Sequence, residues 1–284
     1  MNESALSYFC CYNRVLMSFF KDKVVAITGG SEGIGKALIE TLIPMGAKIA
    51  TCGRNHDKLY ALQTQNAGTP FHAVAADVSN EQDCKNFIDS TIKTFGGIDI
   101  LINNAGISMR ALVKDVNIDV MRRVMDVNFY GAVYCTSFAL PSITARKGSI
   151  IGISSIAGYR GLPGRSAYSA SKFALQGWLE ALRTELMGDE VNVMWICPNF
   201  VTSNIRNVAL DQDGNAQKQN PMDETTLMSA PEAARQIIEA IEKRKRSLIM
   251  TFDGKRTVFL NKFFPSLTDR LVRKFYFDKG KLKK

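Results

Sequence analysis

This chain of 284 residues is poor in the side chains that most often bind metals, with two histidines and six scattered cysteines. The cysteines form no CxxC pair and no other spacing typical of a zinc site, so we expect no metal centre. Their scatter also gives no disulfide framework, which favours a reducing compartment and a cytoplasmic location.

Long uncharged apolar runs are missing as well. None reaches roughly 18 residues, so no segment is predicted to span a membrane. The first residues have no basic region and no small-residue cleavage site, which argues against a signal peptide. We expect residues 1–20 to be a leader outside the packed domain, either unstructured or the product of an upstream start codon, with Met17 as the alternative start.

Positive charge is concentrated at one end of the chain. The formal net charge is +9, and residues 243–284 contain 14 Lys and Arg against 3 Asp and Glu, so the rest of the chain is near neutral. A near-neutral body argues against nucleic-acid binding.

Residues 252–284 form a basic, aromatic C-terminal extension. Leu267, Leu271 and Phe275 recur at helical spacing and predict one apolar stripe. Apolar and cationic side chains in one short segment favour docking on an anionic membrane surface. The alternative is that the extension packs over the edge of the sheet or at a subunit interface, with its lysines solvated.

Apolar runs alternate with helical patterns over residues 21–251. The predicted strands are 24–27, 47–52, 71–76, 98–102, 149–154, 191–197 and 247–251, and the predicted helices are 34–43, 55–65, 79–95, 118–144, 166–187 and 231–243. Repeated strand–helix units predict right-handed crossovers and a parallel sheet. The expected fold class is α/β, a single doubly wound sheet of the Rossmann type with helices on both faces.

A glycine-rich turn, Gly29 to Gly35, joins the first predicted strand to the first predicted helix. Such a turn directs backbone N–H groups and the positive end of a helix toward a phosphate. Gly29 makes the turn, Gly33 allows close approach of a pyrophosphate, and Gly35 allows the helix to pack on the strand. Other polar positions, including Asp77, also follow strands, so they should meet at one edge of the sheet.

Tyr168 and Lys172 stand four residues apart near the start of a predicted helix. Residues at this spacing share a helix face, so the phenol and the ammonium should lie close together. A nearby cation favours the phenolate, which would lower the pKa of Tyr168 toward neutral pH and make it a general acid or base.

Six motifs in this order resemble the short-chain dehydrogenase/reductase family over residues 23–251. They are TGxxxGIG at 28–35, Asp77, NNAG at 103–106, Asn128, Ser155 and YxxxK at 168–172. The resemblance implies that Tyr168 exchanges a proton with the substrate oxygen, that Ser155 hydrogen-bonds this oxygen, and that Lys172 holds the nicotinamide ribose. It implies that Asn128 holds a water linking Lys172 to solvent.

The resemblance also implies a nicotinamide cofactor, which we expect to be NADP(H). NAD-users of the family carry an Asp after the second strand, whereas this chain has Gly53 and then Arg54, which can bind a 2′-phosphate. Glu32 departs from the basic residue that many NADP-users carry in the turn. The further cofactor-binding residues implied are Ser31, Ile34, Asp77, Val78, Asn104, Ala105, Gly106, Pro198, Val201 and Ser203.

The expected substrate is a small apolar ketone or secondary alcohol. Apolar residues at Ile205, Val208, Leu210, Met222, Leu227 and Met228, together with 161–163, are predicted to line its pocket, unless they only pack the loop down. We expect a lipid-like ketone of the 3-ketodihydrosphingosine or steroid type. The alternatives are a 3-oxoacyl thioester reductase and a non-catalytic NADP-binding sensor. The resemblance further implies a homodimer or homotetramer formed through helices 118–144 and 166–187.

Overall fold

The computed structural model describes residues 18–198, 200–217 and 227–283. Within them lies a seven-stranded parallel sheet with the strand order β3-β2-β1-β4-β5-β6-β7. The strands are β1 (Val24–Thr28), β2 (Lys48–Gly53), β3 (Phe71–Ala75), β4 (Ile100–Asn103), β5 (Ser149–Ile153), β6 (Asn192–Cys197) and β7 (Ser247–Ile249). This order confirms the predicted doubly wound sheet, and its switch point lies between β1 and β4.

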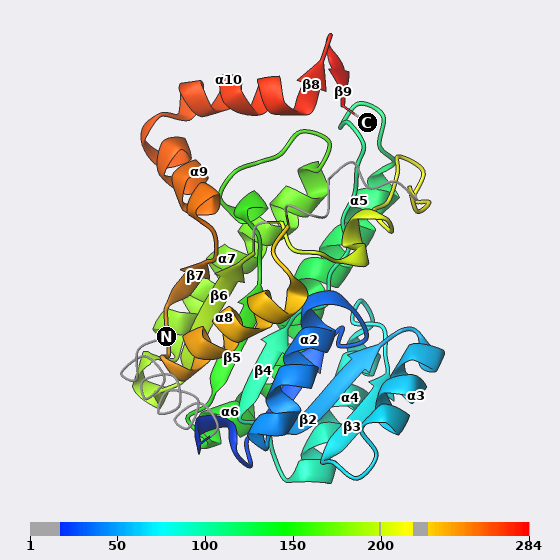
Figure 1. Cartoon of the computed structure of the whole chain (residues 1–284), viewed down its shortest axis with the longest axis vertical. Helices are drawn as coiled ribbons and strands as arrows, with labels where there is room; N and C mark the ends of the chain where they lie inside the picture. Colours follow the sequence, from blue (N-terminus) through cyan, green and yellow to red (C-terminus); the bar gives the residue numbers. More distant parts are fainter. Residues whose placement is uncertain (1–17, 199, 218–226, 284) are drawn as a thin grey trace, which may run out of the picture.

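Helices cover both faces of the sheet (Figure 1). Buried side chains from α2 (Gly33–Leu42) and α8 (Ala230–Glu242) pack on one face. Those from α4 (Glu81–Phe95), α5 (Ile118–Met125), α6 (Gly131–Ala145) and α7 (Ser166–Glu185) pack on the other. Helix α3 (His56–Gln65) follows β2.

Burial on both faces explains why the central strand β1 is apolar at nearly every position. All five residues of β1 are buried, with Val24 and Ala26 facing one helix layer and Val25 and Ile27 the other. A strand covered on both sides needs apolar residues at every position rather than at alternate ones. Phe20, which we had placed in the leader, is fully buried in the same core, so the packed chain begins before residue 21.

The predicted long helix at 118–144 is not regular. A π-helical turn, η2 (Asp126–Tyr130), separates α5 from α6 and contains Asn128. Such turns often occur at functional sites because they re-aim one side chain without ending the helix. Shorter 3-10 turns are η1 (Ile43–Met45), η3 (Ile156–Gly158), η4 (Met187–Asp189) and η5 (Asn204–Arg206).

The C-terminal extension folds into α9 (Phe252–Phe263), α10 (Pro265–Tyr276) and a hairpin of β8 (Phe277–Asp278) and β9 (Lys281–Leu282). Figure 1 shows α9 and α10, in orange and red, beyond the ends of the strands. Arg160 fixes α9 and α10 by hydrogen bonds to Asn261 (3.0 Å) and Asp269 (2.6 Å). At the far end, the guanidinium of Arg110 donates to the carbonyl oxygen of Lys283. The extension is therefore tied to the body near its middle and at its C-terminal end.

No helix in the described residues is both long and apolar enough to cross a membrane.

Candidate active site

A cavity of about 810 Å³ lies at the carboxyl ends of the strands. Its wall collects nearly all the residues that the sequence singled out: Gly29, Ser31, Gly33, Ile34, Arg54, Asp77, Val78, Asn104, Ala105, Gly106, Ser155, Tyr168, Lys172, Pro198, Val201 and Ser203. Gly35 and Asn128 do not line the cavity and instead support residues that do. The predicted convergence at one sheet edge is therefore present.

The glycine turn has the shape that a phosphate site needs. Gly29 and Gly33 have φ angles of 69° and 54°, which side chains rarely adopt. A Cβ on Gly35 would lie 2.4 Å from the carbonyl oxygen of Gly29, so α2 packs against the turn only with glycine there. Helix α2 has no side-chain cap at its N-terminus, and Gly33 and Ile34 line the cavity. These features fit a dinucleotide pyrophosphate.

The segment after β4 holds the turn in place. The amide nitrogen of the Asn104 side chain donates to the carbonyl oxygens of Thr28 (2.9 Å) and Gly29 (3.0 Å). The Thr28 hydroxyl accepts hydrogen bonds from the backbone N–H groups of Asn104 and Ala105, both at 3.0 Å. Asn104 therefore positions the cofactor turn as well as lining the cavity.

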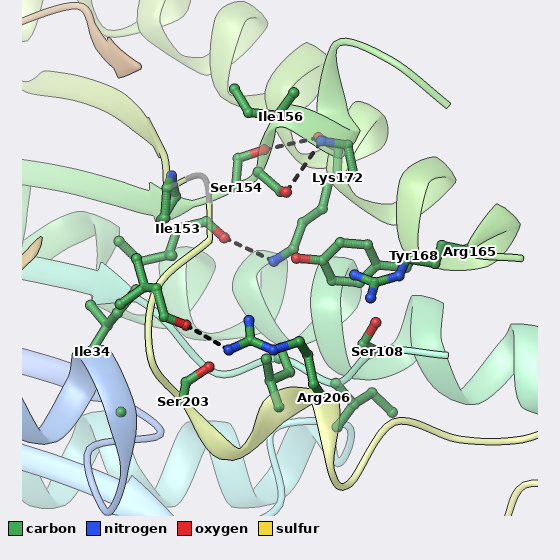
Figure 2. A pocket seen from close by; sticks show the side chains of 18 of the residues that line it. Ile34, Ser108, Ile153, Ser154, Ile156, Arg165, Tyr168, Lys172, Ser203 and Arg206 are labelled. Carbon is green, nitrogen blue, oxygen red and sulfur yellow. Dashed lines mark hydrogen bonds between the residues drawn. The ribbon is translucent and has the colours of Figure 1, made fainter. Parts of the chain in front are cut away.

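Tyr168 and Lys172 lie on one face of the first turns of α7, as predicted (Figure 2). The ammonium of Lys172 lies 5.7 Å from the centre of the Tyr168 ring and donates to the carbonyl oxygen of Ile153 at 2.8 Å. Ser155 follows β5, and its hydroxyl accepts a hydrogen bond from the backbone of Ala157 (3.2 Å). Three proton-bearing groups thus meet on one wall.

The pKa of Tyr168 differs from our expectation. Burial raises it above its ordinary value, while a hydrogen bond from Ser155 and the positive charge of Arg165 act in the opposite direction. We had expected Lys172 to lower it, but burial lowers the pKa of Lys172 itself to about 8. Burial disfavours the charged form of both groups, so Tyr168 keeps its proton at neutral pH.

Asn128 connects the π turn to the cavity wall. Its side-chain oxygen accepts from the backbone N–H of Ile107 (2.8 Å), and its nitrogen donates to the Ile107 carbonyl and the Ser171 hydroxyl, both at 3.0 Å. A Cβ built on Gly106 would lie 3.3 Å from the Asn128 oxygen and 3.6 Å from the Lys172 nitrogen. Asn128 thus lies beside Lys172, and its role toward a water stays a prediction.

Arg54 lies at the end of β2, where its guanidinium is 3.9 Å from the Asp77 carboxylate. Both side chains are partly exposed and line the cavity. Glu32, which we had noted as unfavourable for NADP, forms an ion pair with Lys58 of α3. Lys58 was absent from our sequence-based site. Its position in a separate helix gave no motif that could reveal it.

The loop residues predicted to line the substrate pocket divide into two groups. Ile205, Val208 and, from the other side, Leu162 line the cavity. Leu210 and Met228 instead pack on the two cores, because the loop turns inward to form bridges with Met109 and Val201. Leu227, Gly161 and Pro163 are not part of the cavity wall, and Met222 lies outside the described residues.

The C-terminal extension supplies a wall that our sequence-based site lacked. Residues of α9 and α10 on the cavity include Arg256, Leu260, Leu271, Val272 and Tyr276. The stripe predicted in the extension contained Leu271 and Phe275, but nothing in the sequence indicated that it faces the catalytic residues. Ser108, Arg165 and Arg206 also line the cavity and were not singled out.

Comparison with known proteins shows the family of the chain. Residues 23–214 match the family model described as short chain dehydrogenase. The chain is 34% identical over 266 residues to mouse Dehydrogenase/reductase SDR family member 7B, covering 90% of this chain and 81% of that protein. It is 35% identical to the uncharacterized oxidoreductase YxnA of Bacillus subtilis, covering 90% and 73%.

Solved structures show the same fold. A short chain dehydrogenase/reductase from Burkholderia phymatum, in complex with NAD, superposes with a TM-score of 0.78 at 24% identity, covering 87% of this chain and 95% of that chain. The fold is that of an oxidoreductase family whose members bind a nicotinamide cofactor. This chain belongs to the short-chain dehydrogenase/reductase family.

Proposed function

We propose that this protein is an NADPH-dependent reductase that converts the ketone of an apolar, lipid-like substrate to a secondary alcohol. The observation that carries the proposal is that Ser155, Tyr168 and Lys172 share one cavity with the glycine turn. NADPH, when bound, supplies the hydride that reduces the carbonyl carbon. Tyr168 donates its proton to the carbonyl oxygen, while Ser155 donates a hydrogen bond to the same oxygen.

The raised pKa of Tyr168 keeps the phenol in the protonated form at neutral pH, which is the form that ketone reduction uses. Reduction needs a protonated phenol, and burial keeps the phenol protonated. Alcohol oxidation would need the phenolate. Lys172, held by the Ile153 carbonyl, is in position to hold the nicotinamide ribose and to stabilise negative charge on Tyr168 after proton transfer.

The preference for NADPH rests on Arg54 and Lys58. Arg54 lines the cavity at the end of β2, where a 2′-phosphate would bind. Lys58 pairs with Glu32 and so offsets the negative charge that would repel this phosphate. Arg54 and Lys58 carry two positive charges, which the carboxylates of Glu32 and Asp77 balance. NADPH is therefore preferred only when Arg54 turns from Asp77 to the 2′-phosphate. The 3.9 Å between the Arg54 guanidinium and the Asp77 carboxylate permits this turn.

The substrate class rests on the wall formed by Leu162, Val208, Leu260 and Val272. This apolar lining supports a long-chain ketone of the 3-ketodihydrosphingosine type or a steroid. A direct test measures NADPH oxidation with long-chain ketones, steroids and 3-oxoacyl thioesters. Turnover of thioesters alone would favour the alternative reductase. NADPH binding without turnover of any ketone or alcohol would identify a sensor.

We also propose that the extension docks on an anionic membrane surface. Seven large apolar side chains of α9, α10 and the residue that joins them are between 47% and 79% exposed: Phe252, Phe259, Phe263, Phe264, Leu267, Leu271 and Phe275. Exposed cations lie among them, including Lys262, Arg270 and Lys274. Clustered apolar surface beside positive charge is complementary to an anionic bilayer. Leu271 and Phe275 also line the cavity, so an apolar substrate could enter from the membrane.

We also propose that this chain forms a homodimer or a homotetramer. Ile118, Tyr130 and Phe173 are apolar side chains on α5, η2 and α7 with 44% to 56% of their surface exposed. A second copy of the chain would cover them. Sedimentation equilibrium of the purified protein tests this, and a monomer at micromolar concentration would contradict it.

A further inference from the structure

The cavity holds a buried polar group that no other described residue satisfies. Ser108 lies in the segment after β4 and is 2% exposed, and its hydroxyl has no hydrogen-bond partner within the described part of the chain. Ser108 lines the cavity, and in Figure 2 its hydroxyl points toward the guanidinium of Arg165. Leaving a buried hydroxyl without a hydrogen bond costs free energy. An atom of a bound ligand that forms a hydrogen bond with Ser108 would remove this cost.

Arg165 is the second part of this arrangement. It stands next to the first residue of α7 and lines the cavity near Tyr168. Among the described residues, no carboxylate lies within ion-pair distance of Arg165, and no hydrogen bond engages its guanidinium. The other cations on the same wall do have partners: Arg54 has Asp77, Arg256 has Asp253, Lys172 has the Ile153 carbonyl, and Arg206 has the Val201 carbonyl.

The backbone fixes Ser108 and Arg165 relative to one another. Residues 108–111 run beside the chain that enters α7, where the N–H of Ala111 donates to the Gly164 carbonyl at 3.0 Å. On the opposite side, the N–H of Leu210 donates to the carbonyl of Ser108 at 2.9 Å. Burial, and then the positive charge of Arg165, lower the pKa of Arg110, so the two cations lie close together. Arg165, which has no carboxylate partner among the described residues, and the positive end of α7 therefore make this corner attractive to an anion.

We propose that Arg165 and Ser108 bind an anionic group, a carboxylate or a phosphate, on the same substrate whose ketone is reduced at Tyr168. This proposal rests on the proposed ketone reduction and makes its substrate class narrower. The guanidinium offers a paired hydrogen bond to two anionic oxygens, and Ser108 offers a third donor. Leu260, Leu271 and Val272 face the same cavity and receive an apolar chain. The substrate is then an amphiphilic ketone with one charged end.

The test compares matched probes. Medium-chain oxo acids, with the ketone at several distances from the carboxylate, are measured against their methyl esters and against oxoalkyl phosphates of the same chain. With wild-type protein we expect a lower KM for the acids or the phosphates than for the esters, and the tighter of the two identifies the anion. Arg165→Gln should raise the KM for the preferred anion at least about tenfold, as loss of a charge-assisted hydrogen bond does. The KM for the esters should stay within about twofold.

Two further variants separate anion binding from other effects. Arg165→Lys should recover part of the loss, and Ser108→Ala should raise the KM for the anion but not for the ester. Arg235→Gln removes an equal charge from the exposed surface of α8 and should change neither. In Arg165→Gln, kcat could fall equally for the acids and the esters while the ratio of their KM values stays the same. This result would show that Arg165 acts on Tyr168 alone, and it would overturn the proposal.

A binding measurement keeps this inference separate from the proposed reaction. Calorimetric titration of a saturated medium-chain carboxylate, and of the alkyl phosphate, into protein with NADP⁺ needs no turnover. Binding of either that is lost in Arg165→Gln supports the anion site even if no ketone is reduced. The proposal would be overturned if wild-type protein bound neither the carboxylate nor the alkyl phosphate. It would also be overturned if Arg165→Gln bound them as tightly as wild type does.

Discussion

The ammonium of Lys172 lies 5.7 Å from the centre of the Tyr168 ring and donates its 2.8 Å hydrogen bond to the carbonyl of Ile153. The two side chains are therefore neighbours on α7, but Lys172 is anchored on β5. This anchoring leaves the phenol of Tyr168 to the substrate, with Ser155 beside it. The roles of Tyr168 and Lys172 can therefore be tested by mutating one residue at a time.

Replacing Tyr168 with Phe keeps the ring and removes the proton donor. Ketone reduction should fall at least about 100-fold, the usual size of a general-acid contribution, while NADPH still binds. Stopped-flow NADPH oxidation and fluorescence titration measure the two quantities. Turnover close to wild type would exclude Tyr168 as the acid.

Lys172 predicts a pH dependence of cofactor affinity. Its pKa of about 8 lies below its ordinary value, so it carries its charge at pH 7 and loses it as pH rises through about 8. NADPH affinity should therefore weaken above pH 8. The Lys172→Met variant should bind NADPH more weakly at pH 7 and lack this step. A wild-type affinity that is flat between about pH 7 and 9.5 would contradict the assignment.

The position of Arg54 in the cavity predicts that its removal changes the affinity for NADPH but not the affinity for NADH. Arg54→Ala should weaken NADPH binding by about 1.5–3 kcal/mol, the contribution of a hydrogen bond to a charged group, and leave NADH binding nearly unchanged. Lys85→Ala, which removes an exposed cation from α4, serves as the charge control. Equal losses for NADPH and NADH would show that Arg54 does not recognise the 2′-phosphate.

The wall contributed by α9 predicts a size limit on the substrate. Leu260→Trp should narrow the cavity and lower kcat/KM for long-chain ketones at least about tenfold, because overpacking a filled site forces strain of a few kcal/mol. Short ketones should be affected less. Leu267→Trp, at an exposed position of α10 outside the cavity wall, is the matched control. An equal response from both variants would place the substrate elsewhere.

The exposed face of α9 predicts membrane binding. Full-length protein should float with phosphatidylserine liposomes at low salt, and binding should weaken as salt screens the basic residues. The double variant Phe259→Ser and Phe263→Ser should lose this binding and keep NADPH affinity. Tyr60→Ser changes a more exposed aromatic residue on α3 and should float as wild type does. Wild-type protein that ignores these liposomes at low salt would exclude the proposal.

Much of the fold could be predicted because its signals are local. The run Val24–Thr28 is buried on both faces, and the glycines after it stand where positive φ angles are required. Asn80 caps α4 by accepting a hydrogen bond from the backbone N–H of Asp83, three residues further along the chain. Such features depend on residues close together in the chain, so a single sequence reveals them.

Other parts of the site depend on contacts between distant segments. The bridge between Ala111 and Arg165 brings Ser108 to the same side of the cavity as Arg165, and Lys58 of α3 pairs with Glu32 in the turn before α2. The rise in the pKa of Tyr168 comes from burial, which the spacing of Tyr168 and Lys172 does not encode. The direction taken by α9 and α10 depends on Arg160, which binds residues about a hundred positions away. None of these relationships leaves a pattern in the sequence.

The chain that closes the cavity over Tyr168 is one continuous piece that begins after the last strand of the sheet. Every strand of the main sheet precedes it, as do Ser155, Tyr168 and Lys172. One part of the cavity wall is therefore encoded apart from these three residues, while Leu162, Arg165 and Val208 line the cavity from earlier in the gene. Exchanging the segment after β7 between relatives should transfer the share of substrate preference that α9 and α10 set, and leave Ser155, Tyr168 and Lys172 in place.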